Sequence, residues 1–289
     1  MVRDWCICTG TTTAVSPTGH YKMVRRAAPI HARENQRGLM EPTTMAEASV
    51  IPAIPPQPRG IAPVWHTVIL LLLLLSLALS GTVRSQKETA VAGHSAIYIV
   101  TIVYQWILVG FIAFGVRLRG RTLRDLIGGR WNSVEAVLTD FAIGLGVWFI
   151  IICTAAAVVL SFKLQNSLSQ SGQHLMKKIA PQTNHELALF MVLAITAGFC
   201  EEVIFRGYIQ QQFKAWTNSR VIAVLVSTTF FGLGHLYQGP LLALGPTFLG
   251  LIFAVLAEWR KSLRPGMITH TWQDCLSGVA QHFASKLVH

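Results

Sequence analysis

Long apolar blocks separated by short polar stretches make up most of the chain after residue 60. The blocks run over about 64–81, 94–116, 136–160, 187–206, 220–237, 241–258 and 265–284. A helix needs about 20 apolar residues to cross a bilayer, and each block is near that length. The pattern therefore predicts an all-α, multi-pass transmembrane bundle of about seven or eight helices.

The first block, VWHTVILLLLLLSLALSG at 64–81, has two interpretations. It is either a retained spanning helix or, with Met45 as the natural start, a signal peptide cleaved near Ala78-Leu79-Ser80. We favour the retained helix. Residues 1–60 lack helical or strand periodicity and are predicted to be a disordered extension. Residues 61–116 then form the N-terminal transmembrane helices, and 117–289 form the domain that carries the motifs described below.

The composition excludes most soluble classes. Charged residues are 13% of the chain and hydrophobic residues 52%, whereas a soluble domain typically has roughly 25% charged residues. So few charges cannot cover a globular surface, and the long apolar blocks exclude a disordered or fibrous chain. The five cysteines are an odd number and three lie within apolar blocks, so no disulfide framework is predicted.

The net charge of +11 would suggest nucleic acid if the basic residues formed one soluble patch, but they lie mainly in short stretches between apolar blocks. Such placement is typical of loops that stay in the cytoplasm. The stretch RLRGRTLRDLIGGRW at 117–131 is the strongest example, and 214–220 and 260–264 fall on the same side. The connection 161–185 falls on the outer side of the membrane although it carries three lysines, so it is an exception to this rule. We predict a multi-pass protein of the plasma (inner) membrane, in contact with lipid and without a nucleic-acid partner.

Six ionisable residues lie inside apolar blocks, where each costs a few kcal/mol and is by default a functional hypothesis. They are Glu201, Glu202 and Arg206 in TAGFCEEVIFRGYIQQQF, His235 in TTFFGLGHLYQG, and His270 and Asp274 in MITHTWQDCLSG.

Helical spacing suggests how these residues cooperate. Glu202 and Arg206 are four apart and share a helix face, as do His270 and Asp274. Glu201 lies about 100° around the helix from Glu202, so both carboxylates can border one cavity. With Glu202 held by Arg206, Glu201 is left free to accept a proton as a general base.

Simpler interpretations exist for several polar residues. Taken alone, a Glu–Arg pair four apart is most often a structural ion pair. Asp140 and Glu258 lie near block ends and are read as boundary residues that reach water, whereas His66 and His282 are read as interfacial.

Two histidines and a carboxylate are also the ligands of many catalytic zinc sites. Here the candidate metal ligands are Glu202, His235 and His270. Their spacing is not HExxH, so this alternative depends on helices converging in space, and it stays open beside a metal-free one.

Three motifs in order give the chain a family resemblance. EEVIFR matches EExxxR, FGLGH ending at His235 matches FxxxH, and HTWQD ending at Asp274 matches HxxxN or HxxxD. Together they resemble the CPBP family of intramembrane endopeptidases, which includes type II CAAX prenyl proteases and bacteriocin-processing and abortive-infection relatives. The resemblance covers roughly residues 117–284.

The resemblance implies a peptide-bond hydrolase with its site inside the membrane. Glu201 would activate water, His235 would bind or orient it, and Glu202, Arg206, His270 and Asp274 would complete the site. Zinc is one implied cofactor, and a metal-free glutamate mechanism is the alternative. In the metal-free version the third motif stabilises the oxyanion, and Asp274 is a poorer donor there than the Asn of some relatives, which favours a metal or structural role for it.

The implied substrates are membrane-associated peptides or proteins, prenylated or carrying a leader. A non-catalytic scaffold, immunity or regulatory protein of the same fold is the rival, and a proton-coupled carrier is a second.

The predicted helix ends do not bring the histidines together. Straight helices put His235 about 24 Å from the start of its helix and His270 only about 7 Å from the start of its own. Gly232, Gly234 and the Gly239-Pro240 pair would permit a broken segment, or else the predicted ends are wrong by several residues.

Overall fold

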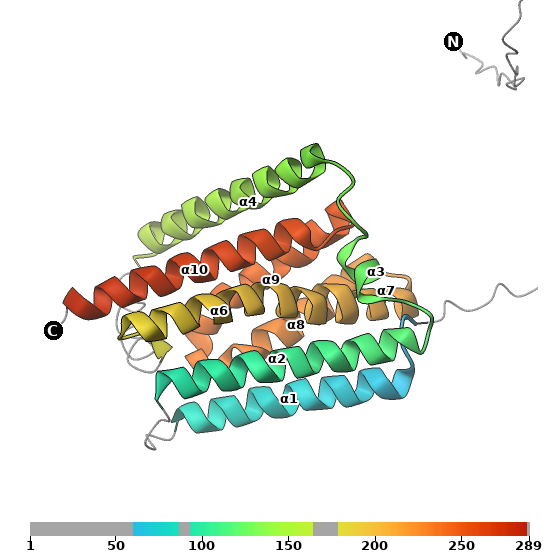
Figure 1. The fold of residues 1–289 in the computed structure, drawn as a ribbon, viewed down its shortest axis with the longest axis horizontal. Helices are drawn as coiled ribbons and strands as arrows, with labels where there is room; N and C mark the ends of the chain where they lie inside the picture. Colours follow the sequence, from blue (N-terminus) through green and yellow to red (C-terminus); the bar gives the residue numbers. More distant parts are fainter. Residues whose placement is uncertain (1–59, 87–92, 164–178, 288–289) are drawn as a thin grey trace, which may run out of the picture. The chain divides into compact units, whose positions relative to one another are not determined.

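A computed structural model describes residues 60–86, 93–163 and 179–287 (Figure 1). The regular structure within these ranges is entirely helical, which confirms the predicted all-α class. The predicted disordered extension, apart from Gly60, lies outside the described residues. The elements are α1 (Val64–Gln86), α2 (His94–Arg117), α3 (Leu123–Ile127), α4 (Val134–Ser161), α6 (Asn184–Glu201), η1 (Glu202–Gln210), α7 (Gln211–Thr217), α8 (Arg220–Gly234), η2 (Leu236–Gln238), α9 (Pro240–Arg260) and α10 (Arg264–Leu287).

Five helical segments are long and apolar enough to cross a membrane. They are Val64–Val83, His94–Arg117, Val134–Ser161, Asn184–Thr217 and Pro240–Arg260. The predicted block 220–237 is instead the shorter apolar helix α8, of 15 residues. The block 265–284 corresponds to α10, which is not apolar enough to be counted among the five possible spanning segments. Because α10 packs between α6 and α4 (Figure 1), its polar residues can face protein rather than lipid.

The helix α6 continues without a break through η1 into α7. It begins at a capping box, in which the Thr183 side chain accepts from the Glu186 backbone N–H and Glu186 accepts from that of Thr183. It ends at Asn218, whose backbone is left-handed (φ 50°). Along this length α6 packs against α2 and α10, and η1 packs against α8 (Figure 1). The long helix is therefore the element on which the others meet.

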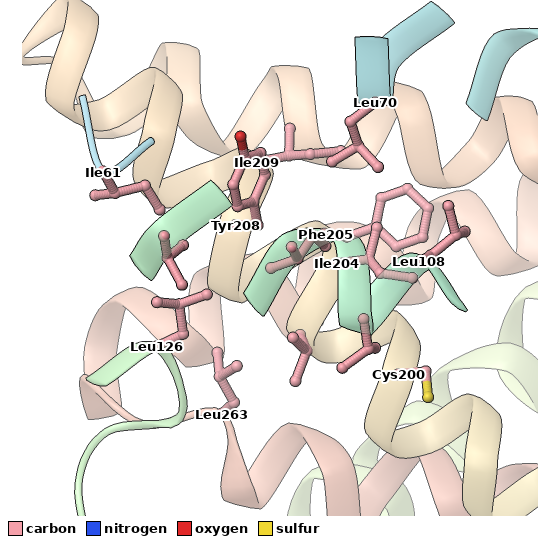
Figure 2. Close-up of a cluster of buried hydrophobic side chains, with 14 of the residues drawn as sticks. Ile61, Leu70, Leu108, Leu126, Cys200, Ile204, Phe205, Tyr208, Ile209 and Leu263 are labelled. Carbon is pink, nitrogen blue, oxygen red and sulfur yellow. The ribbon is translucent and has the colours of Figure 1, made fainter. Parts of the chain in front are cut away.

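The hydrophobic core is built around η1. Figure 2 shows Ile204, Phe205, Tyr208 and Ile209 of η1 directed at side chains from α1, α2, α3 and the segment before α10. Every residue of η1 is buried. A π-helix is rare and is frequently found at functional sites. Here it begins at Glu202, within the first predicted motif, where the sequence analysis assumed an ordinary α-helix.

The first helix is joined to this core by buried polar contacts. His66 Nδ1 lies 2.7 Å from the Tyr208 hydroxyl, and the other ring nitrogen lies 2.9 Å from the Phe111 carbonyl oxygen. Gln212 donates to the Ala62 carbonyl at 2.9 Å. His66 is fully buried rather than interfacial, and so is His282 at 1% exposure. Cleavage near Ala78-Leu79-Ser80 would remove these contacts, and retention of α1 stays a prediction.

The basic segments predicted to share one side of the membrane meet at one end of the bundle. The Leu263 backbone N–H donates to the Ile127 carbonyl at 3.0 Å, which joins the loop before α10 to α3. Nearby, Asp125 caps α3: hydrogen bonds from the Thr122 backbone and hydroxyl lower the pKa of the Asp125 carboxyl. The meeting of these segments agrees with a common side, and the orientation itself stays a prediction.

Two acidic residues at this end pair with basic side chains instead of reaching water as predicted. Asp140 is 4% exposed and accepts from Arg260 at 3.1 Å and from the Trp131 indole at 2.8 Å. Glu258 accepts from Lys214 at 2.8 Å. The attraction of a paired cation compensates part of the free energy lost when such a carboxylate leaves water.

The close approach of α6 and α10 depends on Gly198. A Cβ at this position would lie 2.8 Å from the Thr271 backbone nitrogen. Gly198→Ala should therefore lower the midpoint of thermal unfolding in detergent by several degrees, since one helix must move. Gly110→Ala on α2 is the matched control, because its Cβ would meet nothing within 4 Å and Ala favours a helix by up to about 1 kcal/mol over Gly. Equal shifts for both variants would contradict this account of the α6–α10 contact.

Candidate active site

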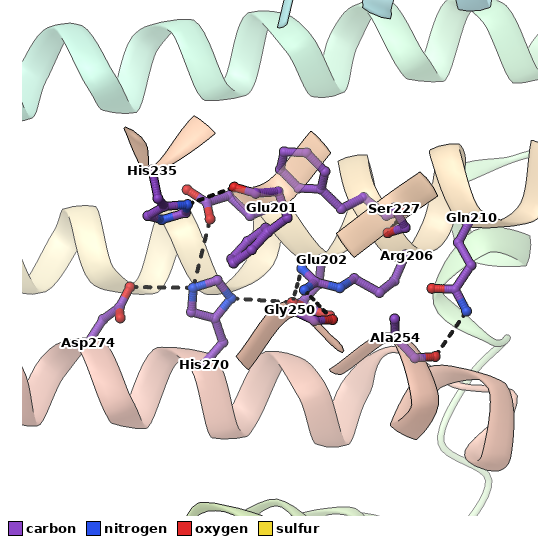
Figure 3. Close-up of polar contacts among 12 residues, drawn as sticks. Glu201, Glu202, Arg206, Gln210, Ser227, His235, Gly250, Ala254, His270 and Asp274 are labelled. Carbon is purple, nitrogen blue, oxygen red and sulfur yellow. Dashed lines mark hydrogen bonds and ion pairs between the residues drawn. The ribbon is translucent and has the colours of Figure 1, made fainter. Parts of the chain in front are cut away.

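Three separate segments bring the six predicted residues together. The junction of α6 and η1 supplies Glu201, Glu202 and Arg206, the end of α8 supplies His235, and α10 supplies His270 and Asp274. Figure 3 shows the carboxylates and rings of this set directed toward one another from these elements. The motif residues, up to 73 positions apart in sequence, thus form one polar cluster inside a largely apolar bundle.

A buried ion pair anchors the cluster. Arg206 Nη1 donates to Glu202 Oε1 at 2.8 Å, and both side chains are fully buried. The second guanidinium nitrogen donates to the Gly250 carbonyl at 2.9 Å. The guanidinium carbon lies 4.3 Å from the centre of the Phe231 ring and 5.4 Å from that of Phe253. The predicted pair is therefore present, and its arginine is enclosed by aromatic rings from α8 and α9.

Glycine at position 250 makes room for this arginine. A Cβ there would lie 3.3 Å from Arg206 Nη2 and 2.9 Å from the Phe231 ring. The bare backbone of α9 can therefore approach the guanidinium and accept its hydrogen bond.

The Glu201 carboxylate has one bound oxygen and one without a hydrogen bond. Its Oε1 accepts from Gln105 Nε2 at 2.8 Å. Its Oε2 is buried and has no hydrogen-bond partner among the described residues. His270 Nε2 lies 3.8 Å from Oε2, which is too long for a hydrogen bond. Glu202 Oε2 is likewise buried without a hydrogen-bond partner, so the two carboxylates differ in that Glu202 is paired with Arg206, whereas no lysine or arginine of the described residues pairs with Glu201.

Three carboxylates surround the His270 ring. Its Nδ1 lies 3.3 Å from Glu202 Oε1, and its Nε2 lies 3.6 Å from Asp274 Oδ2 as well as near Glu201. The ring also stacks on Phe253, with 5.3 Å between the centres. His270 therefore joins the buried ion pair to the exposed side of the cluster. Asp274 faces this ring, so the arrangement supports a role for Asp274 in orienting His270.

His235 lies at a break in the chain. α8 ends at Gly234, the short η2 follows, and Gly239 with φ 96° begins the turn into α9. His235 Nδ1 lies 2.9 Å from the Phe231 carbonyl oxygen. A carbonyl only accepts, so Nδ1 carries the hydrogen and the neutral ring keeps a lone pair on Nε2. This lone pair is available to a water molecule.

The two histidines lie close together in the structure, against the estimate from the sequence. The rings of His235 and His270 both contact Phe231, with 4.7 and 6.0 Å between ring centres. The helix α8 runs unbroken from Arg220 to Gly234, and the break at η2 follows His235. The estimate therefore failed because it assumed parallel helices that start at one level.

The predicted zinc ligands do not fit a metal ion. Within the described ranges, no three His, Cys, Asp or Glu side chains are arranged to hold one. Of the proposed set, Glu202 already accepts from Arg206, and His270 Nδ1 is directed at the same carboxylate oxygen. A cation bound to Glu202 would also lie beside a buried guanidinium, with which it would repel. No chemical step below is therefore assigned to a metal.

The sequence analysis missed Gln105. This residue lies in α2, outside all three motifs, yet it makes the only direct hydrogen bond to Glu201 from another helix among the described residues. The sequence feature that could have indicated Gln105 was a single amide side chain in the middle of the apolar block 94–116. A buried amide in such a block needs a polar partner, but the sequence does not say which partner it finds.

One known family resembles part of the C-terminal half of the chain. Residues 183–276 match the family model described as type II CAAX prenyl endopeptidase Rce1-like. This range contains all three motifs and confirms the resemblance drawn from them. No curated protein and no solved structure matches the chain. The family is one of membrane proteases, which act on peptide or protein substrates, and the five apolar segments agree with a membrane protein.

The buried ion pair generates a stability prediction. Arg206→Met should lower the unfolding free energy by about 3–5 kcal/mol, because Glu202 then becomes an uncompensated buried charge. The double variant Glu202→Gln with Arg206→Met should recover a large part of this loss, since no charge is left behind. Thermal unfolding of the single and double variants in the same detergent measures the loss of stability and its recovery. A double variant no more stable than Arg206→Met would contradict the ion-pair account.

Proposed function

We propose that this protein is an intramembrane endopeptidase in which Glu201 activates the attacking water. The observation that carries the proposal is the buried, unpartnered Oε2 of Glu201 beside two histidines. An unpaired buried carboxylate oxygen is costly, and a water molecule accounts for it. Glu202 Oε2 is also buried without a partner, but Glu202 is paired with Arg206, whereas no lysine or arginine of the described residues pairs with Glu201. A carboxylate left without a fixed cation beside two histidines is why we favour the enzyme.

The proposed reaction uses the residues of the cluster in turn. A water molecule donates one hydrogen bond to Glu201 Oε2 and another to the lone pair of His235 Nε2. Glu201 takes a proton from this water as the oxygen attacks the scissile carbonyl carbon. Glu201 then passes the proton to the leaving nitrogen as the C–N bond breaks, which gives a carboxylic acid and an amine.

The remaining residues hold this geometry. His270 lies between Glu201 and Asp274 and is the cluster's donor nearest to Glu201 Oε2. We assign to its Nε2, with both ring nitrogens protonated, the hydrogen bond that stabilises negative charge on the carbonyl oxygen. Glu202 orients the ring through Nδ1, at 3.3 Å, and Asp274 lies beside Nε2. Glu202 and Arg206 fix the helix junction from which Glu201 projects. Positioning of this kind strongly affects rate, because about 1 Å of misplacement can cost 100-fold.

The surroundings of the cluster limit its substrates. Helices enclose it, so a peptide must enter from the lipid or from the membrane surface. We therefore infer substrates that are already membrane-associated, of which prenylated C-terminal peptides and leader peptides are the two classes to test. The basic end of the bundle supports an orientation with that end in the cytoplasm, in a plasma membrane.

Replacing the general base tests the proposal. Glu201→Gln removes the proton acceptor but keeps the shape, so cleavage should fall by about 100- to 10,000-fold. The assay is cleavage of quenched fluorescent peptides, prenylated and leader-type, by the detergent-purified chain. Glu135→Gln is the matched control: Glu135 is an exposed carboxylate at the start of α4, and its loss should leave the rate unchanged.

Cleavage by Glu201→Gln at the wild-type rate would overturn the assigned role. A folded wild-type protein that cleaves none of these peptides would favour the scaffold or regulatory alternative.

Treatment with chelators distinguishes the two mechanisms named by the resemblance. The pairing of Glu202 with Arg206 supports a metal-free reaction. We expect cleavage to persist after prolonged treatment with 1,10-phenanthroline and to be unchanged by added zinc. Zinc content, measured on the same samples, should not correlate with rate. Loss of cleavage that only zinc restores would reverse this assignment.

A further inference from the structure

Gln105 is an amide in the apolar face of α2. It is 2% exposed and shares that face with Tyr98, Leu108 and Ile112, which are also buried. Taking an amide out of water without a hydrogen bond costs free energy. An apolar side chain would fill this position at no such cost, so the amide calls for an explanation beyond packing.

The contact with Glu201 fixes the orientation of this amide. A carboxylate accepts, so Gln105 donates through Nε2 to Glu201 Oε1 at 2.8 Å. The amide oxygen of Gln105 then points elsewhere, and it is buried without a hydrogen-bond partner. The only side-chain hydrogen bond of Gln105 among the described residues is thus the one to a single oxygen of Glu201.

The same contact makes the two oxygens of Glu201 different. Oε1 is held by Gln105, and Oε2 has no hydrogen bond. A carboxylate tied at one oxygen cannot rotate freely, so the lone pairs of the other oxygen keep a constant direction. A general base needs a lone pair that points at the water molecule from which it takes the proton.

We propose that Gln105 is a positioning residue, which holds Glu201 through Oε1 and so presents Oε2 to the attacking water. This inference rests on the proposed endopeptidase function. It adds a residue from α2, a helix outside the range 183–276 that matches the family model. It also gives α2 a part in the chemistry besides its part in packing.

The helix that carries Gln105 is itself held at both ends. Near its start, the Tyr98 hydroxyl donates to the Ile179 carbonyl at 2.6 Å. Near its end, the Phe111 carbonyl faces His66 at 2.9 Å. The position of Gln105 relative to α6 is therefore set by contacts that do not involve Glu201, as a positioning residue requires.

The chain offers a matched control for a purely structural role. Gln210 is also fully buried, also donates through Nε2, here to the Ala254 carbonyl at 2.9 Å, and also has an unpartnered amide oxygen. Gln210 lies on the same long helix as Glu201, but its side chain is away from Glu201 (Figure 3). Replacing either glutamine with Met removes one short buried hydrogen bond at nearly constant volume, and at Gln210 also a long contact of 3.5 Å with Glu258. Only the change at Gln105 touches Glu201.

The experiment compares the wild-type chain, Gln105→Met, Gln210→Met and Glu201→Gln, all full-length in one detergent. We expect Gln105→Met to lower kcat by about 10- to 100-fold, as loss of a hydrogen bond to a charged group does. Its KM should stay within about twofold of wild type, because the base acts on chemistry rather than on peptide binding. Gln210→Met should keep the wild-type kcat. Equal kcat values for the two Met variants would overturn the positioning role.

A thermal double-variant cycle tests the contact without using activity. Gln105→Met and Glu201→Met should be non-additive, by about 2–4 °C in unfolding midpoint for a chain of this size, because Met at position 201 cannot accept the hydrogen bond of Gln105. Gln210→Met and Glu201→Met should be additive within error. Additive shifts in the first cycle would overturn the contact.

The two readouts separate failure of this inference from failure of the proposed function. If wild type cleaves, Glu201→Gln does not, and Gln105→Met matches Gln210→Met, then the protease assignment stands and the role of Gln105 is refuted. If wild type cleaves nothing, the proposed function fails and the role of Gln105 fails with it, whatever the thermal cycle gives.

Discussion

The buried pair of Glu202 and Arg206 is the constraint on which the rest of the site depends. Two full charges with no exposure must neutralise each other, and the guanidinium has further donors to satisfy. Those demands bring the bare backbone of α9 at Gly250 and the rings of Phe231 and Phe253 around it. Once these contacts are made, the junction of α6 and η1 is fixed relative to α8 and α9, and Glu201 projects from a defined place.

The ion pair also gives the two adjacent carboxylates, Glu201 and Glu202, different environments. Glu202 is paired with Arg206 and lies near His270, whereas Glu201 accepts a hydrogen bond from an uncharged amide at one oxygen and lies 3.8 Å from His270 at the other. Neighbours in sequence thus occupy different electrostatic environments, because the helix turns by about 100° between them. A structural carboxylate and a chemically available one arise from one EE dipeptide. This division is also what makes Glu202 a poor metal ligand.

The polar helix α10 and the broken end of α8 show how a membrane-embedded bundle accommodates such a site. α10 carries His270 and Asp274 and packs between α6 and α4, so its polar side chains avoid lipid. At His235 the helix stops, and the ring hydrogen-bonds to the Phe231 carbonyl of the last turn. Irregular backbone at membrane depth is tolerated where it is enclosed by protein or borders a water-filled cavity.

The sequence by itself determined the helical class, the starts and ends of most apolar segments, the Glu202–Arg206 pair and the identity of the six motif residues. It could do so because apolar length, four-residue spacing and costly polar groups are local signals. Tertiary structure alone decided the π-helix at Glu202, the approach of His235 to His270, the burial of His66 and the contact of Gln105 with Glu201. Each of these depends on which helices become neighbours, and that is set by packing between residues far apart in the chain.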